Sequence, residues 1–63
     1  MKAGGGREIF VEFVRQGNAV KVTAIDSITG LEASIVGPAT APQNILAEAA
    51  RRKLDYLAKR KPR

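Results

Sequence analysis

The chain of 63 residues contains no cysteine, no histidine and no tryptophan. Without cysteine there are no disulfide bonds and no thiolate metal sites, and without histidine the commonest general base and zinc ligand is missing. The sequence also lacks an apolar run near the roughly 20 residues of a membrane-spanning helix. Glycines and charges fill the start of the chain, which argues against a secretory signal peptide. We therefore expect one soluble, cytoplasmic domain with no catalytic residue, no cofactor and no metal ion.

Apolar and polar side chains alternate through residues 8–36, which is the pattern of half-buried strands. Gly17-Asn18 predicts the first turn, although a turn centred on Gln16-Gly17 fits as well, and residues 26–30 predict the second. Pairing Asp26 with Leu31 keeps the apolar side chains of both strands on one face. The alternation thus predicts a three-stranded antiparallel β-meander in the order 1-2-3.

Residues 41–61 are rich in Ala, Leu, Lys and Arg and predict one C-terminal helix, which Pro62 ends. Thr40 and Gln43 match a capping box, with Pro42 in the first turn. The helix is amphipathic, so it is expected to pack on the apolar face of the sheet and give an α+β fold of the order βββα. Residues 1–6 are expected to form a flexible tail, and residues 62–63 a short one. The expected core comprises Ile9, Val11, Phe13, Val20, Val22, Ala24, Leu31, Ala33, Ile35, Ile45, Leu46, Ala49, Ala50, Leu54 and Leu57.

The net charge of +5 is unevenly distributed. Residues 1–41 carry four charges of each sign, whereas residues 42–63 carry seven basic and two acidic residues. Pairs at i,i+4 are expected to neutralise part of the helix; they are Glu48–Arg52, Arg51–Asp55 and Asp55–Lys59. The remaining cations complement the dipole at the helix C-terminus and favour solubility. The alternative is a surface that contacts nucleic-acid phosphate or anionic lipid; its residues would be Arg52, Lys59, Arg60, Lys61 and Arg63.

Lys53 and Arg60 fall inside the apolar arc of the helix. We expect their methylene groups to lie over the sheet edge, with the charged ends in water.

Glu8, Glu12 and Glu32 are expected on the sheet face away from the helix. Paired carboxylates can perform acid–base chemistry or bind a hard cation. A flat sheet in so short a chain offers no cleft that excludes water, so solvated charges that discourage edge pairing are the preferred interpretation. Domains of similar shape, such as the AP2 type, place the sheet in the DNA major groove with Arg and Lys. Here the outward acidic residues would repel phosphate, because only Lys21 opposes them.

Four apolar side chains are also expected on that outward face, and they are Phe10, Val14, Ile25 and Val36. A cluster of this kind predicts a contact surface for an unidentified protein partner or for a homodimer. Both outer strands are edges as well, so extension of the sheet between two copies is a further route to a dimer. The favoured function is a small non-enzymatic protein-interaction module.

Several segments resemble a family of short alphaproteobacterial proteins described as a domain of unknown function. They are Val20-Lys21-Val22-Thr23-Ala24-Ile25-Asp26, Thr29-Gly30-Leu31-Glu32, Ile35-Val36-Gly37-Pro38, Ala41-Pro42 and Arg52-Lys53-Leu54-Asp55-Tyr56. The similarity extends over about residues 7–61. It implies a bacterial, cytoplasmic, stand-alone protein and supplies no activity, cofactor or catalytic residue.

Overall fold

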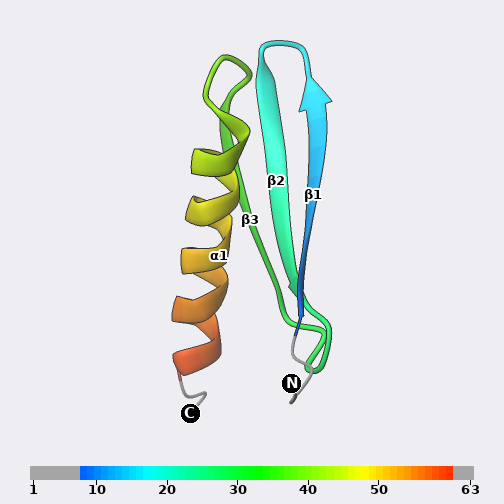
Figure 1. Cartoon of the computed structure of the whole chain (residues 1–63), viewed down its shortest axis with the longest axis vertical. Coiled ribbons are helices and arrows are strands. Elements are labelled where there is room, and N and C mark those ends of the chain that lie inside the picture. The colour runs from blue at the N-terminus through cyan, green and yellow to red at the C-terminus, as the bar shows by residue number, and fades with distance from the viewer. Residues whose placement is uncertain (1–7, 61–63) are drawn as a thin grey trace.

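The computed structural model describes residues 8–60, which form three strands and one helix. These are β1 (Ile9–Gln16), β2 (Ala19–Asp26), β3 (Glu32–Pro38) and α1 (Gln43–Lys59). The strands form one antiparallel sheet in the order β1-β2-β3, and α1 follows and packs against it (Figure 1). The predicted α+β meander with one C-terminal helix is therefore confirmed. The expected tails at residues 1–6 and 62–63 lie outside the described residues.

Two glycines with positive φ angles shape the two turns of the sheet. Gly17 has a φ of 61° and forms a two-residue turn with Asn18, because Gln16 pairs with Ala19. Gly30 has a φ of 77°, a conformation that side chains with a Cβ rarely adopt. Of the two registers predicted for the first hairpin, the one centred on Gly17-Asn18 is correct.

Asp26 organises the second turn from a buried position. Its side chain is 3% exposed, and its Oδ1 accepts hydrogen bonds from the backbone N–H groups of Ile28 at 2.8 Å and Thr29 at 3.1 Å. The Asp26 backbone N–H donates to Leu31 O at 2.9 Å, and the Asp26 carbonyl accepts from Gly30 N at 2.9 Å. This arrangement confirms the predicted pairing of Asp26 with Leu31.

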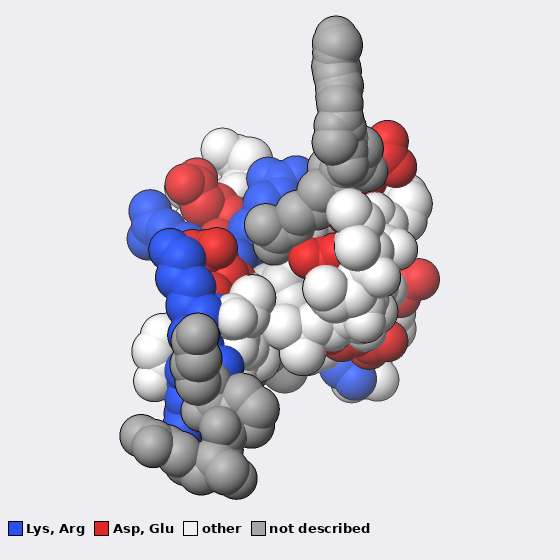
Figure 2. All heavy atoms as spheres, turned by 90° about the horizontal axis from the view of Figure 1, so that it is seen from below, with Lys and Arg blue, Asp and Glu red and all other residues white. Residues whose placement is uncertain are grey.

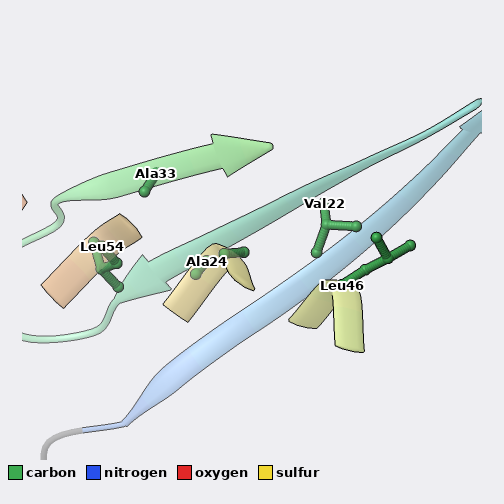
Figure 3. Close-up of a cluster of buried hydrophobic side chains, with 6 residues drawn as sticks. Val22, Ala24, Ala33, Leu46 and Leu54 are labelled. Carbon is green, nitrogen blue, oxygen red and sulfur yellow. The ribbon is translucent and has the colours of Figure 1, made fainter. Parts of the chain in front are cut away.

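The core lies between α1 and the strands β2 and β3. In Figure 1, α1 and β1 flank β2 and β3 on opposite sides. In this core Leu46 of α1 lies near Val22, whereas Leu54 of α1 lies near Ala24 and Ala33 (Figure 3). The buried apolar residues are Val22, Ala24, Ala33, Leu46, Ala47, Ala50 and Leu54. Half-buried residues packed against them are Ile9, Val11, Val20, Leu31, Ile35, Ala41 and Leu57.

Three residues that were expected in the core are exposed. Phe13 is 38% exposed because α1 packs on β2 and β3 and leaves β1 largely uncovered. Ile45 is 55% exposed, and Ala49 is exposed as well. The helix is rotated relative to the prediction, so that Ala47, which was not expected in the core, is buried instead.

The start of α1 also differs from the prediction. Pro42 is the N-cap residue, and no side chain caps the helix, so the capping box of Thr40 and Gln43 is wrong. Thr40 belongs instead to a turn that the hydrogen bond from Ala41 N to Pro38 O closes at 3.0 Å. The first helical bonds are made to Pro42 O, and α1 (Gln43–Lys59) begins two residues later than the predicted start at residue 41. The predicted end at residue 61 lies outside the described residues.

Gly37 brings the end of β3 close to the first turns of α1. A Cβ at this position would lie 2.5 Å from Cδ2 of the buried Leu46 side chain. Glycine is therefore the residue that lets the strand and the helix approach each other here.

Candidate functional site

The sheet face opposite α1, called here the open sheet face, carries the predicted contact residues. Antiparallel pairing aligns Phe10 with Ile25, and Lys21 with both Val14 and Val36. Phe10 is 53% exposed, Val14 49% and Val36 70%, whereas Ile25 is half-buried. The structure thus brings all four predicted residues onto one face, and three of them are exposed.

Charged and hydroxyl side chains separate these apolar residues. Glu12 lies opposite Thr23, and Glu32 lies opposite Ile25, so both acidic residues share the open sheet face. Thr23 and Ser34 share a hydrogen bond between their hydroxyl oxygens at 2.9 Å. In the described part of the chain no three acidic groups gather closely enough to hold a metal ion. The face is polar between its apolar side chains and carries more negative than positive charge.

The basic residues lie mainly on the side of α1, with acidic residues among them (Figure 2). Arg52 pairs with Glu48 at 3.6 Å, and Lys59 pairs with Asp55 at 3.1 Å, which confirms two of the three predicted ion pairs. Among residues 8–60 the third pair, between Arg51 and Asp55, is not formed.

Of the predicted phosphate contacts, Arg52 and Lys59 are the two in these ion pairs. A third, Arg60, places its guanidinium 5.7 Å from the centre of the Tyr56 ring. Lys61 and Arg63 lie outside the described residues. Phosphate binding by this surface stays a prediction.

Lys53 reaches from α1 to the outer edge of the sheet. Its Nζ donates a hydrogen bond of 2.8 Å to the backbone carbonyl of Ser34 in β3. The placement at the sheet edge agrees with the sequence analysis, but the bond to the strand backbone was not anticipated. The sequence shows a lysine inside the apolar arc of the helix. This position places Lys53 beside the sheet, but it does not identify the carbonyl that accepts its hydrogen bond.

A shallow hollow lies on the outer side of α1, lined by Ile45, Glu48, Ala49 and Arg52. Glu48 and Arg52 already pair with each other there, and the other two side chains are apolar. The hollow therefore contains no nucleophile and no acid–base pair.

Within residues 8–60, no helix has both the length and the apolar composition needed to cross a membrane. A comparison with curated proteins and a comparison with solved structures gave no match. A family model described as a domain of unknown function (DUF6898) matches residues 6–61. This match spans nearly the whole chain, and it agrees with the resemblance found in the turn and core segments. The chain therefore belongs to the DUF6898 family, whose function is unknown.

Proposed function

We propose that the chain is a small, non-enzymatic protein-interaction module that binds a second copy of itself through the open sheet face. The observation that carries the proposal is the exposure of Phe10, Val14 and Val36 on that one face. Scattered apolar side chains are normal on a protein surface, but several on one uncovered face indicate a contact surface.

The pattern of charge on the open sheet face favours a second copy as the occupant. Glu12 and Lys21 lie on neighbouring strands, one same-face position apart. With strands about 4.8 Å apart and same-face residues about 7 Å apart, a two-fold rotation can face two sheets so that Glu12 of each copy meets Lys21 of the other. The same rotation places Phe10 near Val36 of the second copy.

The proposal of a non-enzymatic protein rests on the residues that chemistry would need. The chain contains no histidine and no cysteine to act as a base, a nucleophile or a soft metal ligand. Glu12 and Glu32 are exposed on an open strand surface, where water solvates both carboxylates. Such a surface suits contact with another protein better than it suits catalysis.

The family resemblance also implies a source and a cellular location for the protein, and both are part of the same proposal. We infer an alphaproteobacterial origin from the resemblance. We infer a cytoplasmic location from the lack of cysteine.

Sedimentation equilibrium of the wild type, a Val36→Asp variant and an Ile45→Asp variant tests the proposal. Val36 is 70% exposed on the open sheet face, whereas Ile45 is 55% exposed on α1 and outside that face. We expect Val36→Asp to lower the average mass at a given concentration and Ile45→Asp to leave it unchanged. Equal masses for Val36→Asp and the wild type, with both proteins folded by circular dichroism, would overturn the proposal.

A further inference from the structure

The composition of β1 does not suit its place at the edge of the sheet. Five of its first six residues, Ile9-Phe10-Val11-Glu12-Phe13-Val14, are apolar. Nearly continuous apolar sequence is typical of strands that are covered on both faces inside a sheet. In this structure β1 pairs with β2 only, and Phe10, Phe13 and Val14 are exposed on its two faces.

The backbone groups on the free side of β1 can be identified from the ladder. Antiparallel partners alternate between pairs that exchange hydrogen bonds and pairs that do not. Ser27 N donates to Glu8 O at 2.9 Å, so Glu8 and every second residue after it bond to β2. The N–H and C=O groups of Ile9, Val11 and Phe13 therefore point outward, where residues 8–60 provide no partner.

The other edge of the sheet is obstructed. Asp26 N donates to Leu31 O, and the alternation from this pair places the backbone groups of Glu32, Ser34 and Val36 on the outer side of β3. Lys53 Nζ occupies the Ser34 carbonyl in the middle of that edge, and Pro38 has no N–H to donate. An added strand would have to displace the lysine, so β1 is the edge that is open to pairing.

We propose that two copies of the chain pair antiparallel along β1 and form one continuous six-stranded sheet. The two-fold axis of such a pair is perpendicular to the sheet, so both helices lie on the same face. The occupant is a second copy because β1 is complementary to itself: each copy offers the same outward N–H and C=O groups and the same apolar residues. Pairing gives β1 the central position that its composition indicates.

Charge selects the register of this pairing. Because the outward groups belong to odd-numbered residues, the pair can be centred on any residue of β1, and the centres that pair three or more of these residues are Val11, Glu12 and Phe13. Centring on Phe13 would place the apolar Val11 opposite the charged Arg15 of the second copy. Centring on Glu12 would place two glutamates directly opposite each other, which is destabilising. Centring on Val11 places Ile9 opposite Phe13 of the second copy, and Phe10 opposite Glu12 of the second copy. The register centred on Val11 is therefore the one proposed, and it covers part of the exposed Phe13 ring.

The edge pairing goes beyond the contact through the open sheet face and does not depend on it. It uses backbone groups along one edge, whereas the other contact uses side chains on one face. If both contacts form, the edge pairing also places two open sheet faces side by side and doubles the apolar surface. Variants that alter one contact leave the groups of the other in place, so a failure of either proposal can be recognised separately.

Disulfide cross-linking tests the edge and the register together, because the natural chain contains no cysteine. In the proposed register Val11 faces its own copy in a hydrogen-bonded pair, with Cα atoms about 5.5 Å apart, within the range that a disulfide spans. Val11→Cys treated with oxidised glutathione should become a covalent dimer of twice 6.8 kDa. The control is Val36→Cys, at the edge of β3, which is more exposed and should remain mostly monomeric on a denaturing gel. Cross-linking of Val11→Cys no faster than that of Val36→Cys would overturn the proposal.

Two variants, each with one proline substitution, provide the second test. Val11→Pro removes an outward N–H from β1 and no bond within the sheet, and Glu32→Pro does the same at the first residue of β3. Val11→Pro should lower the average mass in sedimentation equilibrium, and Glu32→Pro should leave it unchanged. A folded Val11→Pro variant with the wild-type mass would refute the edge pairing.

Hydrogen exchange of the wild type covers the case in which Val11→Pro does not fold. The amide protons of Val11 and Phe13 should exchange more slowly as protein concentration rises, while that of Glu32 keeps its rate. Rates for Val11 and Phe13 that do not change with concentration would contradict the pairing.

Discussion

Lys53 Nζ donates a 2.8 Å hydrogen bond to the backbone carbonyl of Ser34, so a helix side chain closes the outer edge of β3. Edge strands expose rows of unpaired backbone groups, and a lysine across such an edge hinders the addition of another strand. The two edges of this sheet therefore differ: β3 is protected by α1, whereas β1 is not.

The first prediction follows from this protection. Lys53→Met keeps the aliphatic stem but removes the donor, and it should leave the β3 edge open to pairing. We expect assemblies larger than those of the wild type, in proportions that increase with concentration, by size exclusion with light scattering. Arg52→Met is the matched control, because it removes the same charge from a side chain that pairs with Glu48 and not with the sheet. Equal masses for Lys53→Met and the wild type would show that the lysine does not protect the edge.

The second prediction concerns the turn between β2 and β3. Asp26→Ala removes the acceptor of the Ile28 and Thr29 N–H groups from a buried site. Bonds to a charged acceptor are stronger than neutral ones, so the free energy of unfolding should fall by about 2 kcal/mol in urea titrations. Asp26→Asn keeps an oxygen at Oδ1 and should lose less. A loss in Asp26→Asn as large as that in Asp26→Ala would mean that these two bonds do not account for the effect.

The third prediction concerns the approach of β3 to α1. Gly37→Ala should destabilise the fold by about 1–3 kcal/mol, because its Cβ would overlap the buried Leu46 side chain. Leu46→Ala should cost about 2–5 kcal/mol through loss of packing. In the double variant the alanine at position 37 has room, so its added cost should be close to zero. Additive losses in chemical denaturation would rule out this contact as the reason for glycine.

The fourth prediction concerns nucleic acid. Arg52 and Lys59 already form ion pairs on α1, and the open sheet face carries more acidic than basic residues. Labelled DNA and RNA of mixed sequence should therefore show no saturable change in fluorescence anisotropy with about 10 µM protein at 50 mM salt, the condition that favours phosphate contacts. Saturable binding that weakens as salt is added would support the basic surface and contradict this expectation.

The elements of the sheet could be predicted because strand alternation and turn residues are local signals. The register of β2 and β3 followed from keeping Val22 and Ala24 on the apolar face, and the structure agrees. The helix was also predicted, but the capping box predicted for its start is wrong. Thr40 fits a capping motif in sequence, while the turn from Pro38 to Ala41 positions it before the helix begins.

The core of the helix could be predicted only in part, because periodicity gives the apolar arc but not the direction in which the arc faces. Ile45 and Ala49 lie at one side of that arc and remain exposed, whereas Ala47 at the other side is buried. Periodicity also does not say which strands a helix covers. Phe13 lies on the predicted face of the sheet but is left exposed, because α1 packs on β2 and β3.

Sedimentation equilibrium of the wild-type chain over a wide concentration range is the most direct test of self-association. The expected result is an average mass that rises above the 6.8 kDa of one chain to at least twice that value as concentration increases. A mass of 6.8 kDa at every concentration would contradict both the contact through the open sheet face and the pairing of β1.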